Sequence, residues 1–113
     1  MAYGYVIVDM KINDMDGFKA YMAAAPASIK DAGGEYLTRG GKIESLEGAW
    51  QPTRMTILRF PSFEQAKQWY DSEMYRQARA KRADTTDYFN LVLTEGIDAP
   101  VENSSPQQDQ GKP

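Results

Sequence analysis

Two arginines on either side of a connection are the first candidates for chemistry in this chain. Arg39 and Arg54 lie in a stretch from Tyr36 to Tyr75 that also holds both tryptophans. If their guanidinium groups converge, they could bind the carboxylate of a small organic acid through paired hydrogen bonds. The same arginines could instead form structural ion pairs with acidic residues, of which the candidates are Glu44, Glu47 and Asp71. The sequence leaves both interpretations open.

Three hydroxyl side chains follow further along, at Tyr70, Ser72 and Tyr75. Their spacing could place hydroxyl groups on one side of a helix break, where they would bind or protonate an oxygen atom of a substrate. The competing interpretation is that Ser72 caps a second helical segment and the tyrosines pack with exposed hydroxyls. Arg82 could approach the same cleft or interact with the C-terminal end of that helix.

The two tryptophans have different interpretations. Trp50 lies in a loop before Pro52, where it could form the wall of an apolar pocket, anchor the loop or contact a second subunit. Trp69 falls on an apolar helical stripe, which favours a place in the core.

The residue types that are missing exclude many kinds of site. The 113 residues include no cysteine and no histidine, which excludes disulfides, thiol nucleophiles, histidine triads, zinc fingers and histidine-ligated haem. We expect no metal site and no cofactor, so acid–base work would fall to Asp, Glu, Tyr or Lys. Asp9 could act as a base if it were buried beside the cleft, because burial raises the pKa of a carboxyl group. The net charge of −3 argues against nucleic acid or an anionic membrane as a partner.

Apolar periodicity predicts the elements that position these side chains. Alternation predicts strands over residues 3–12, 35–39, 54–60 and 88–94. Helices are expected after an N-cap at Asn13-Asp14 and after the capping box that begins at Ser62. The second of these helices is expected to break at Asp71-Ser72 and to end near Ala83.

Glycine and proline mark the expected interruptions. Pro26 should kink or restart the first helix, because proline removes a backbone donor, and Gly33-Gly34 should end it. Gly40-Gly41 lacks the length and the following residues of a phosphate loop. We interpret it as a bulge, past which Lys42–Leu46 could continue the second strand.

The order strand, helix, strand, strand, helix, strand predicts an α+β, ferredoxin-like fold with a four-stranded antiparallel sheet and both helices on one face. Several strands carry large apolar residues on both faces, so a monomer would expose an apolar face. We therefore expect a homodimer paired through the sheet face.

Residues 1–97 are expected to form one domain, and the polar residues 98–113 are expected to form a flexible tail. The chain has no apolar run long enough to span a membrane and no signal peptide at its start, so a cytoplasmic location is expected.

The motifs also resemble a known family, the one catalogued as domain of unknown function 1330. The resemblance covers residues 3–96 and rests on Arg39-Gly40-Gly41, Leu46-Glu47-Gly48-x-Trp50-x-Pro52-x-Arg54, Phe60-Pro61-Ser62, Ala66, Trp69-Tyr70-x-Ser72-x-x-Tyr75 and Arg82. It implies a ferredoxin-like fold of the dimeric α/β-barrel group, usually in small bacterial proteins. It implies no reaction, because the wider group includes cofactor-free monooxygenases, haem-handling proteins, isomerases and lactone-forming enzymes, and fold alone does not choose among them.

Two functional hypotheses follow. In the first, a cleft between sheet and helices binds a small organic acid or aromatic metabolite. Arg39 and Arg54 would then clamp the anion, Trp50 would form a wall, and Tyr70, Ser72 and Tyr75 would donate hydrogen bonds. Any catalysis would be cofactor-free proton transfer or oxygenation. In the second, the protein is a non-catalytic module whose polar and aromatic residues stabilise the hairpin and the dimer.

Overall fold

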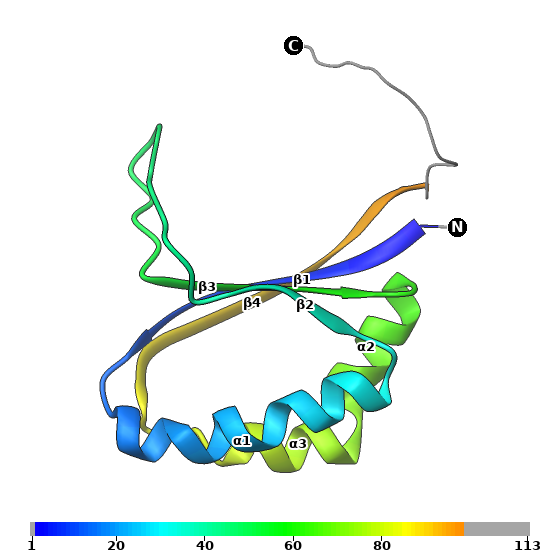
Figure 1. Ribbon diagram of the computed structural model, residues 1–113, viewed down its shortest axis with the longest axis horizontal. Coiled ribbons are helices and arrows are strands. Elements are labelled where there is room, and N and C mark those ends of the chain that lie inside the picture. The colour runs from blue at the N-terminus through cyan, green and yellow to red at the C-terminus, as the bar shows by residue number, and fades with distance from the viewer. Residues whose placement is uncertain (1, 99–113) are drawn as a thin grey trace.

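The computed structural model describes residues 2–98, and the remainder of the expected tail lies outside the described residues. The elements in chain order are β1 (Ala2–Ile12), α1 (Met15–Asp31), β2 (Glu35–Arg39), β3 (Arg54–Phe60), α2 (Phe63–Asp71), α3 (Glu73–Ala80) and β4 (Thr86–Asp98). The strands form one antiparallel sheet in the order β2-β3-β1-β4, and the helices all cover one face of it (Figure 1). The predicted ferredoxin-like fold is confirmed.

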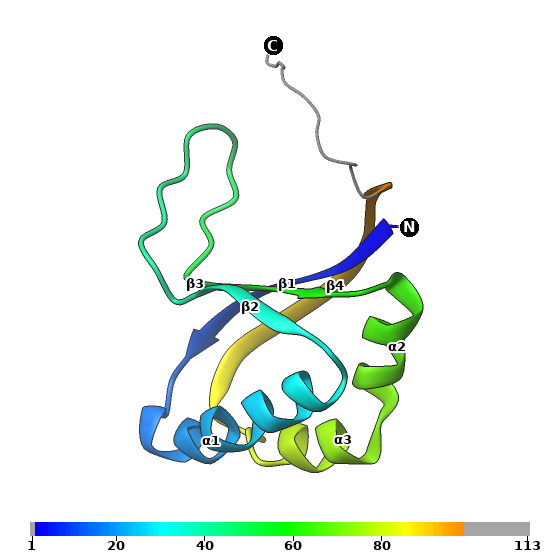
Figure 2. The same cartoon turned by 45° about the vertical axis from the view of Figure 1, so that its right-hand side comes forward.

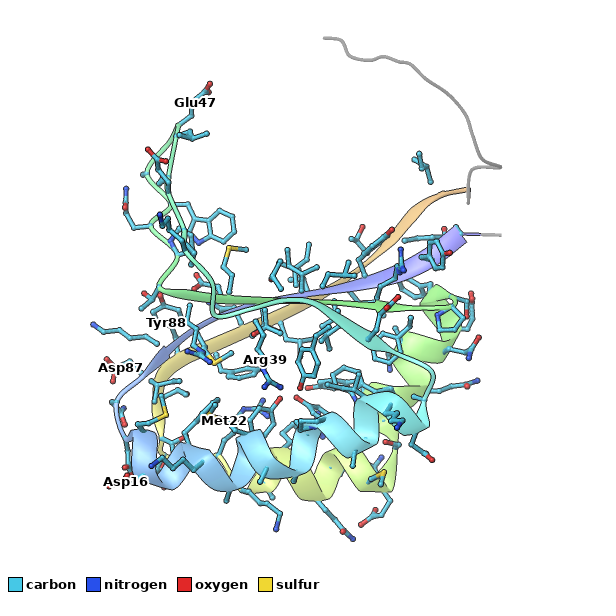
Figure 3. All side chains as sticks on the ribbon, viewed as in Figure 1. Asp16, Met22, Arg39, Glu47, Asp87 and Tyr88 are labelled. Atoms are coloured by element: carbon cyan, nitrogen blue, oxygen red, sulfur yellow. The ribbon has the colours of Figure 1, made fainter. Side chains whose placement is uncertain are left out.

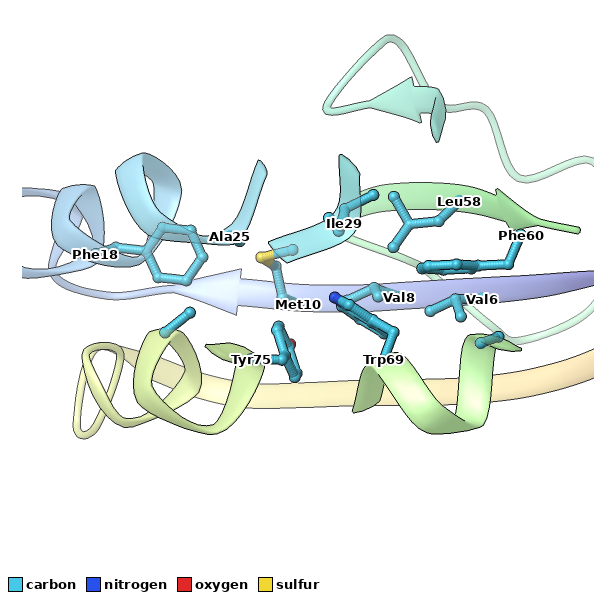
Figure 4. Close-up of a cluster of buried hydrophobic side chains, with 12 residues drawn as sticks. Val6, Val8, Met10, Phe18, Ala25, Ile29, Leu58, Phe60, Trp69 and Tyr75 are labelled. Atoms are coloured by element: carbon cyan, nitrogen blue, oxygen red, sulfur yellow. The ribbon is translucent and has the colours of Figure 1, made fainter. Parts of the chain in front are cut away.

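The strand alternation sorts side chains between the two faces as the sequence predicts. The face turned towards the helices buries Val6, Val8, Met10, Thr56, Leu58 and Phe60. Helical side chains complete the core, among them Phe18, Ile29, Trp69 and Tyr75 (Figure 4). Trp69 is 2% exposed, and its Nε1 donates to Ser28 Oγ at 3.0 Å. The expectation that Trp69 belongs to the core is confirmed.

The helix ends follow the capping signals in the sequence. A carboxylate oxygen of Asp14 accepts an N–H from the first turn of α1, and Ser62 Oγ does the same for α2, both at 3.0 Å. After α1 the chain turns at Gly33, whose φ is 82°. The N–H groups of Gly33 and Gly34 donate to carbonyl oxygens in the last turn of α1, which is the usual hydrogen-bond pattern of a glycine stop.

Two expected interruptions differ from the structure. First, the first helix does not restart at Pro26, since α1 runs through the proline as one helix, with the buried residues Ala25, Ser28 and Ile29 on both sides of it. Second, Lys42–Leu46 does not continue the second strand. Gly40 adopts a φ of 73°, a left-handed conformation that suits glycine, and the following residues leave the sheet.

Two element lengths also differ from the prediction. The last helix ends at Ala80 rather than near Ala83, and β4 is longer than residues 88–94. Pairing with β1 extends from Ile12 opposite Thr86 to Ala2 opposite Asp98. The long first strand therefore holds the last strand in the sheet over its whole length, and Asp98 belongs to β4 rather than to the tail.

The second face of the sheet is apolar at its centre, and none of the helices within residues 2–98 covers it. Ile7 of β1 lies opposite Ile57 of β3 and Val92 of β4, and Val92 is 57% exposed. Residues 41–53 rise as a loop on this side, away from the helices (Figure 2). We call the surface formed by Ile7, Ile57 and Val92 the open face.

Candidate functional site

A cavity of about 50 Å³ lies between the sheet and α1. Its walls are mostly apolar, with contributions from Val8, Met10, Phe18, Met22, Ala25, Ile29, Leu58, Trp69, Phe89 and Leu91. Polar side chains enter at five positions, which are Tyr21, Tyr36, Arg39, Arg54 and Thr56. A space of this size holds a few water molecules, and it is smaller than the roughly 300–1,000 Å³ of most ligand pockets, so the side chains around it would have to move apart to admit a ligand.

Arg39 and Arg54 both line this cavity. Arg39 ends β2 and Arg54 begins β3, and Figure 3 shows Arg39 directed from the sheet towards α1, which carries Met22. The Arg39 guanidinium lies over the ring of Tyr36, with 4.6 Å between Cζ and the ring centroid. The structure therefore brings together the two arginines that the sequence suggests as a pair.

Gly40 sets the position of the Arg54 side chain. A Cβ atom at Gly40 would lie 2.8 Å from Cζ of Arg54, so the guanidinium packs directly against the glycine backbone. The N–H of Gly40 donates to the carbonyl oxygen of Met55 at 2.8 Å, which fixes this contact beside the start of β3. The positive φ favours glycine here, and a side chain at this position would displace the Arg54 guanidinium.

Within residues 2–98, neither arginine forms an ion pair with an acidic side chain. Of the acidic residues considered as partners, Asp71 pairs with Lys67 at 2.5 Å. Glu47 lies at the outer end of the loop on the other side of the sheet (Figure 3). The cavity wall includes no Asp or Glu. The site is therefore positively charged, in a chain whose net charge is negative.

Two tyrosines meet at one side of the cavity: Tyr21 lines it, and Tyr75 is fully buried. The hydroxyl oxygens of Tyr21 and Tyr75 are 2.7 Å apart, and Nη1 of Arg82 donates to the Tyr75 hydroxyl at 3.3 Å. Arg82 is held between two rings, with Cζ 3.7 Å from the centroid of Phe89 and 4.9 Å from that of Tyr21. Of the two expectations for Arg82, the structure therefore agrees with an approach to the cleft.

Burial keeps the phenols of this region protonated. The pKa of Tyr21 is raised well above its ordinary value, first by burial and then by the neighbouring Tyr75 hydroxyl. Burial also raises the pKa of Tyr36, although its interaction with Arg39 opposes the change. The phenol groups of the two tyrosines that line the cavity are therefore neutral donors at neutral pH.

Trp50 lies on the opposite side of the sheet from the cavity. Its Nε1 donates to Oδ2 of Asp9 at 3.0 Å, and the backbone N–H of Thr53 donates to Oδ1 of the same carboxylate at 3.0 Å. The Thr53 hydroxyl also bonds to that of Tyr88 at 2.6 Å. Asp9 is buried, at 7% exposed, but it anchors the loop on the open face and does not line the cavity.

Tyr70, Ser72 and Tyr75 do not form one hydroxyl cluster. Ser72 caps α3 by accepting from the N–H of Tyr75 at 3.2 Å, and its hydroxyl donates to the carbonyl oxygen of Trp69 at 2.7 Å. Tyr70 stacks beneath Arg79, with 4.4 Å from Cζ to the ring centroid. Only Tyr75 turns its hydroxyl towards Tyr21 and the cavity wall.

Sequence reasoning missed Tyr21 and Tyr36 as polar residues of the cavity. Tyr21 lies on the apolar stripe of α1 beside Phe18 and Met22, where a tyrosine is indistinguishable from a core residue. The available signal was its hydroxyl, since a buried tyrosine hydroxyl usually needs a hydrogen-bond partner.

None of the helices within residues 2–98 has the length and apolar character needed to span a membrane.

No curated protein matches the chain. Among solved structures, a protein of unknown function from Rhodopseudomonas palustris superposes with a TM-score of 0.69 at 14% identity, over 87% of this chain and 85% of that one.

Two other solved structures are similar in fold. A protein provisionally assigned as an antibiotic biosynthesis monooxygenase, from Caulobacter crescentus, has a TM-score of 0.59 at 15% identity, over 88% of this chain and 91% of that one. A dimeric ferredoxin-like protein of unknown function from Thermobifida fusca has a TM-score of 0.56 at 14% identity, over 85% and 92%. Identities this low support the fold alone. The model of one family, Domain of unknown function (DUF1330), matches residues 3–97, and the chain belongs to that family.

Proposed function

We propose that this protein binds a small organic acid in the cavity between the sheet and α1. The observation that carries the proposal is the pairing of Arg39 and Arg54 in a mostly apolar cavity whose wall holds no acidic residue. A carboxylate would satisfy both guanidinium groups, and the apolar part of the ligand would pack against the core side chains around it. Arginine suits this role because its planar donors match the two oxygens of a carboxylate.

The cavity wall limits the chemistry that the site supports. Its polar groups are guanidinium and hydroxyl groups, which donate hydrogen bonds and stabilise negative charge on oxygen. Catalysis, where it occurs, would be cofactor-free proton transfer or oxygenation of a bound anion. Trp50 and Ser72, which lie outside the cavity wall, would support the site from the loop and the helix junction.

Binding of a simple carboxylate tests the proposal. Pentanoate is titrated into the wild type, Arg39→Gln, Arg54→Gln and the double variant, with the affinity followed by calorimetry or NMR. We expect each single substitution to weaken binding at least about tenfold, because a hydrogen bond to a charged group contributes roughly 1.5–3 kcal/mol. Arg76→Gln, on the exposed side of α3, is the matched control for charge. Wild-type affinity in the double variant would refute the anion site.

A second candidate function is structural. Trp50 is 58% exposed on the side of the open face, and the similar protein from Thermobifida fusca is described as dimeric. These observations favour a homodimer paired through the open face, with the loop as part of the contact. If stabilising the dimer is the sole role, Trp50→Ala will dissociate it or lower its melting temperature, Arg39→Ala, on the cavity side of the sheet, will leave it paired, and no carboxylate will bind.

A further inference from the structure

We infer that Tyr21 donates a hydrogen bond to a second oxygen atom of the bound acid, and that Tyr75 and Arg82 are positioning residues that turn the Tyr21 proton towards the ligand. The inference rests on the proposed function, and it narrows the ligand class to acids that carry an additional acceptor oxygen, such as oxo acids. The juxtaposition behind it is the chain of contacts from Arg82 to Tyr75 to Tyr21.

The direction of the hydrogen bonds follows from burial and from what each group can donate. A guanidinium group has no acceptor, so Arg82 donates to the oxygen of Tyr75. The Tyr75 hydroxyl is on a side chain that is 0% exposed. Within residues 2–98 its other hydrogen-bond partner is Tyr21. If Tyr21 donated to Tyr75, the Tyr75 proton would be buried without an acceptor, which costs about 1–3 kcal/mol. Tyr75 therefore donates to Tyr21.

This assignment leaves the Tyr21 proton free. The Tyr21 oxygen accepts from Tyr75, so its own O–H must point elsewhere, and Tyr21 lines the cavity. Each donor in such a chain is strengthened by the bond that its oxygen accepts, and here the chain begins at a cation. The Tyr21 hydroxyl is thus a strengthened donor for an oxygen atom in the cavity.

Arg82 is held for this task by aromatic rings. Its guanidinium lies against Phe89 and Tyr21, and it forms no ion pair with an acidic side chain within residues 2–98. An adjacent carboxylate would weaken the positive field that polarises the two tyrosines. The positive charge of Arg82 acts to lower the pKa of Tyr21, but burial raises that pKa by more, so the donor persists throughout the neutral pH range.

The donors around the cavity define the ligand class. The two arginines offer hydrogen bonds to a carboxylate, Tyr21 offers one to a separate oxygen, and the wall contains no acidic residue that would bind an ammonium group. An acid with a carbonyl oxygen satisfies this pattern, whereas an amino acid would place its ammonium group among cations and donors.

Matched probes test the ligand class. Pentanoate, 2-oxopentanoate and 4-oxopentanoate share a carbon chain and differ in the presence and place of the carbonyl oxygen. We expect one of the oxo acids to bind the wild type about tenfold more tightly than pentanoate, as one strengthened hydrogen bond would give. In Tyr21→Phe this preference should disappear while the affinity for pentanoate stays within about twofold. Tyr70→Phe, outside the cavity wall, is the control and should keep the preference.

Two outcomes of this experiment would overturn the inference. One is an equal preference for the oxo acid in the wild type and Tyr21→Phe, and the other is a preference that is lost in Tyr36→Phe alone. If Arg54→Gln weakens all three probes but no oxo preference exists, the proposed function survives and the inference fails. If no probe binds the wild type, both fail.

The positioning role has a separate measurement that needs no ligand. In protein with ¹³C at the ζ carbon of tyrosine, the hydroxyl proton of Tyr75 should exchange slowly with solvent, because it is buried and bonded to Tyr21. The hydroxyl proton of Tyr21, a residue that lines the cavity, should exchange faster. In Arg82→Gln the order should stay the same, but the oxo preference should fall. A slowly exchanging Tyr21 proton that is bonded to Tyr75 would reverse the assigned direction and refute this role.

Discussion

At the scale of single residues, Tyr21 determines both a stability effect and a proposed contact. Its hydroxyl is hydrogen-bonded to that of Tyr75, and folding raises its pKa above the ordinary 10.0. An acid whose pKa is raised by folding is neutral in the folded state and ionises more easily when unfolded. Its contribution to stability is thus complete below pH 10 and is lost as the pH rises towards the folded-state pKa.

The alkaline stability of Tyr21→Phe tests this pKa shift. Above pH 10 the free energy of unfolding of the wild type should fall by about 1.4 kcal/mol per pH unit from this group alone. In Tyr21→Phe the free energy of unfolding should fall less steeply with pH, because this ionisable group is gone. The variant should be less stable than the wild type at pH 9, because the hydrogen bond between the two hydroxyl groups is lost. Urea unfolding between pH 9 and 11 gives both slopes, and identical slopes would contradict the shift.

Gly40 allows a test in which conformation and contact are separated. Gly40→Ala should cost about 1 kcal/mol of stability through its positive φ, and its methyl group should displace the Arg54 guanidinium. Pentanoate affinity should therefore fall several-fold. Gly48→Ala is the matched control, because Gly48 has a φ of 86° but open space around it. It should lose similar stability and keep the affinity. Equal affinities in the two variants would contradict the role of Gly40.

At the scale of elements, the junction between α2 and α3 positions the tyrosine pair. Ser72 accepts from the N–H of Tyr75 and donates to the carbonyl oxygen of Trp69, so one side chain ends the first helix and begins the second. The turn between them places Tyr75 with its ring 4.1 Å from that of Trp69, measured between centroids. A continuous helix would carry Tyr75 elsewhere.

Ser72→Ala should therefore affect more than helix stability. Loss of the cap should cost about 1 kcal/mol, measured by chemical unfolding. It should also loosen Tyr75 and reduce the preference for an oxo acid. Ser62→Ala removes the equivalent cap of α2 and should cost a similar amount with the ligand preference intact. A Ser72→Ala protein with unchanged preference would show that the junction plays no part in the site.

At the scale of the whole molecule, the exposed apolar surface of the sheet favours association. Val92→Lys places a charge at the centre of the open face, and it should turn the proposed dimer into a monomer, because burying an unpaired ammonium group is costly. Ala27→Lys adds the same charge on an exposed position of α1 and should leave the dimer intact. Sedimentation velocity distinguishes the two states, and a dimer that tolerates Val92→Lys would place its interface elsewhere.

The fold was predictable because its signals are local. Alternation along β1 and β3, the caps at Asp14 and Ser62, and the glycine stop at Gly33 all depend on neighbouring residues. The path of residues 41–53 could not be predicted, because it depends on hydrogen bonds to the Asp9 carboxylate, which is more than 40 residues away in sequence. The same limit applies to Tyr21 and Arg82, which meet at Tyr75 and so bring together α1, α3 and the turn after α3.

The anchoring of the loop by Asp9 has a thermodynamic consequence. Asp9 holds Thr53 on the open face, and the next residue, Arg54, enters the cavity on the other side of the sheet. If two copies associate through the open face, a change in this loop on dimerisation would be transmitted to Arg54. Thermodynamic linkage is reciprocal. If dimerisation changes the affinity for the ligand by some factor, ligand binding changes the dimerisation constant by the same factor. The apparent affinity for the acid would vary with protein concentration.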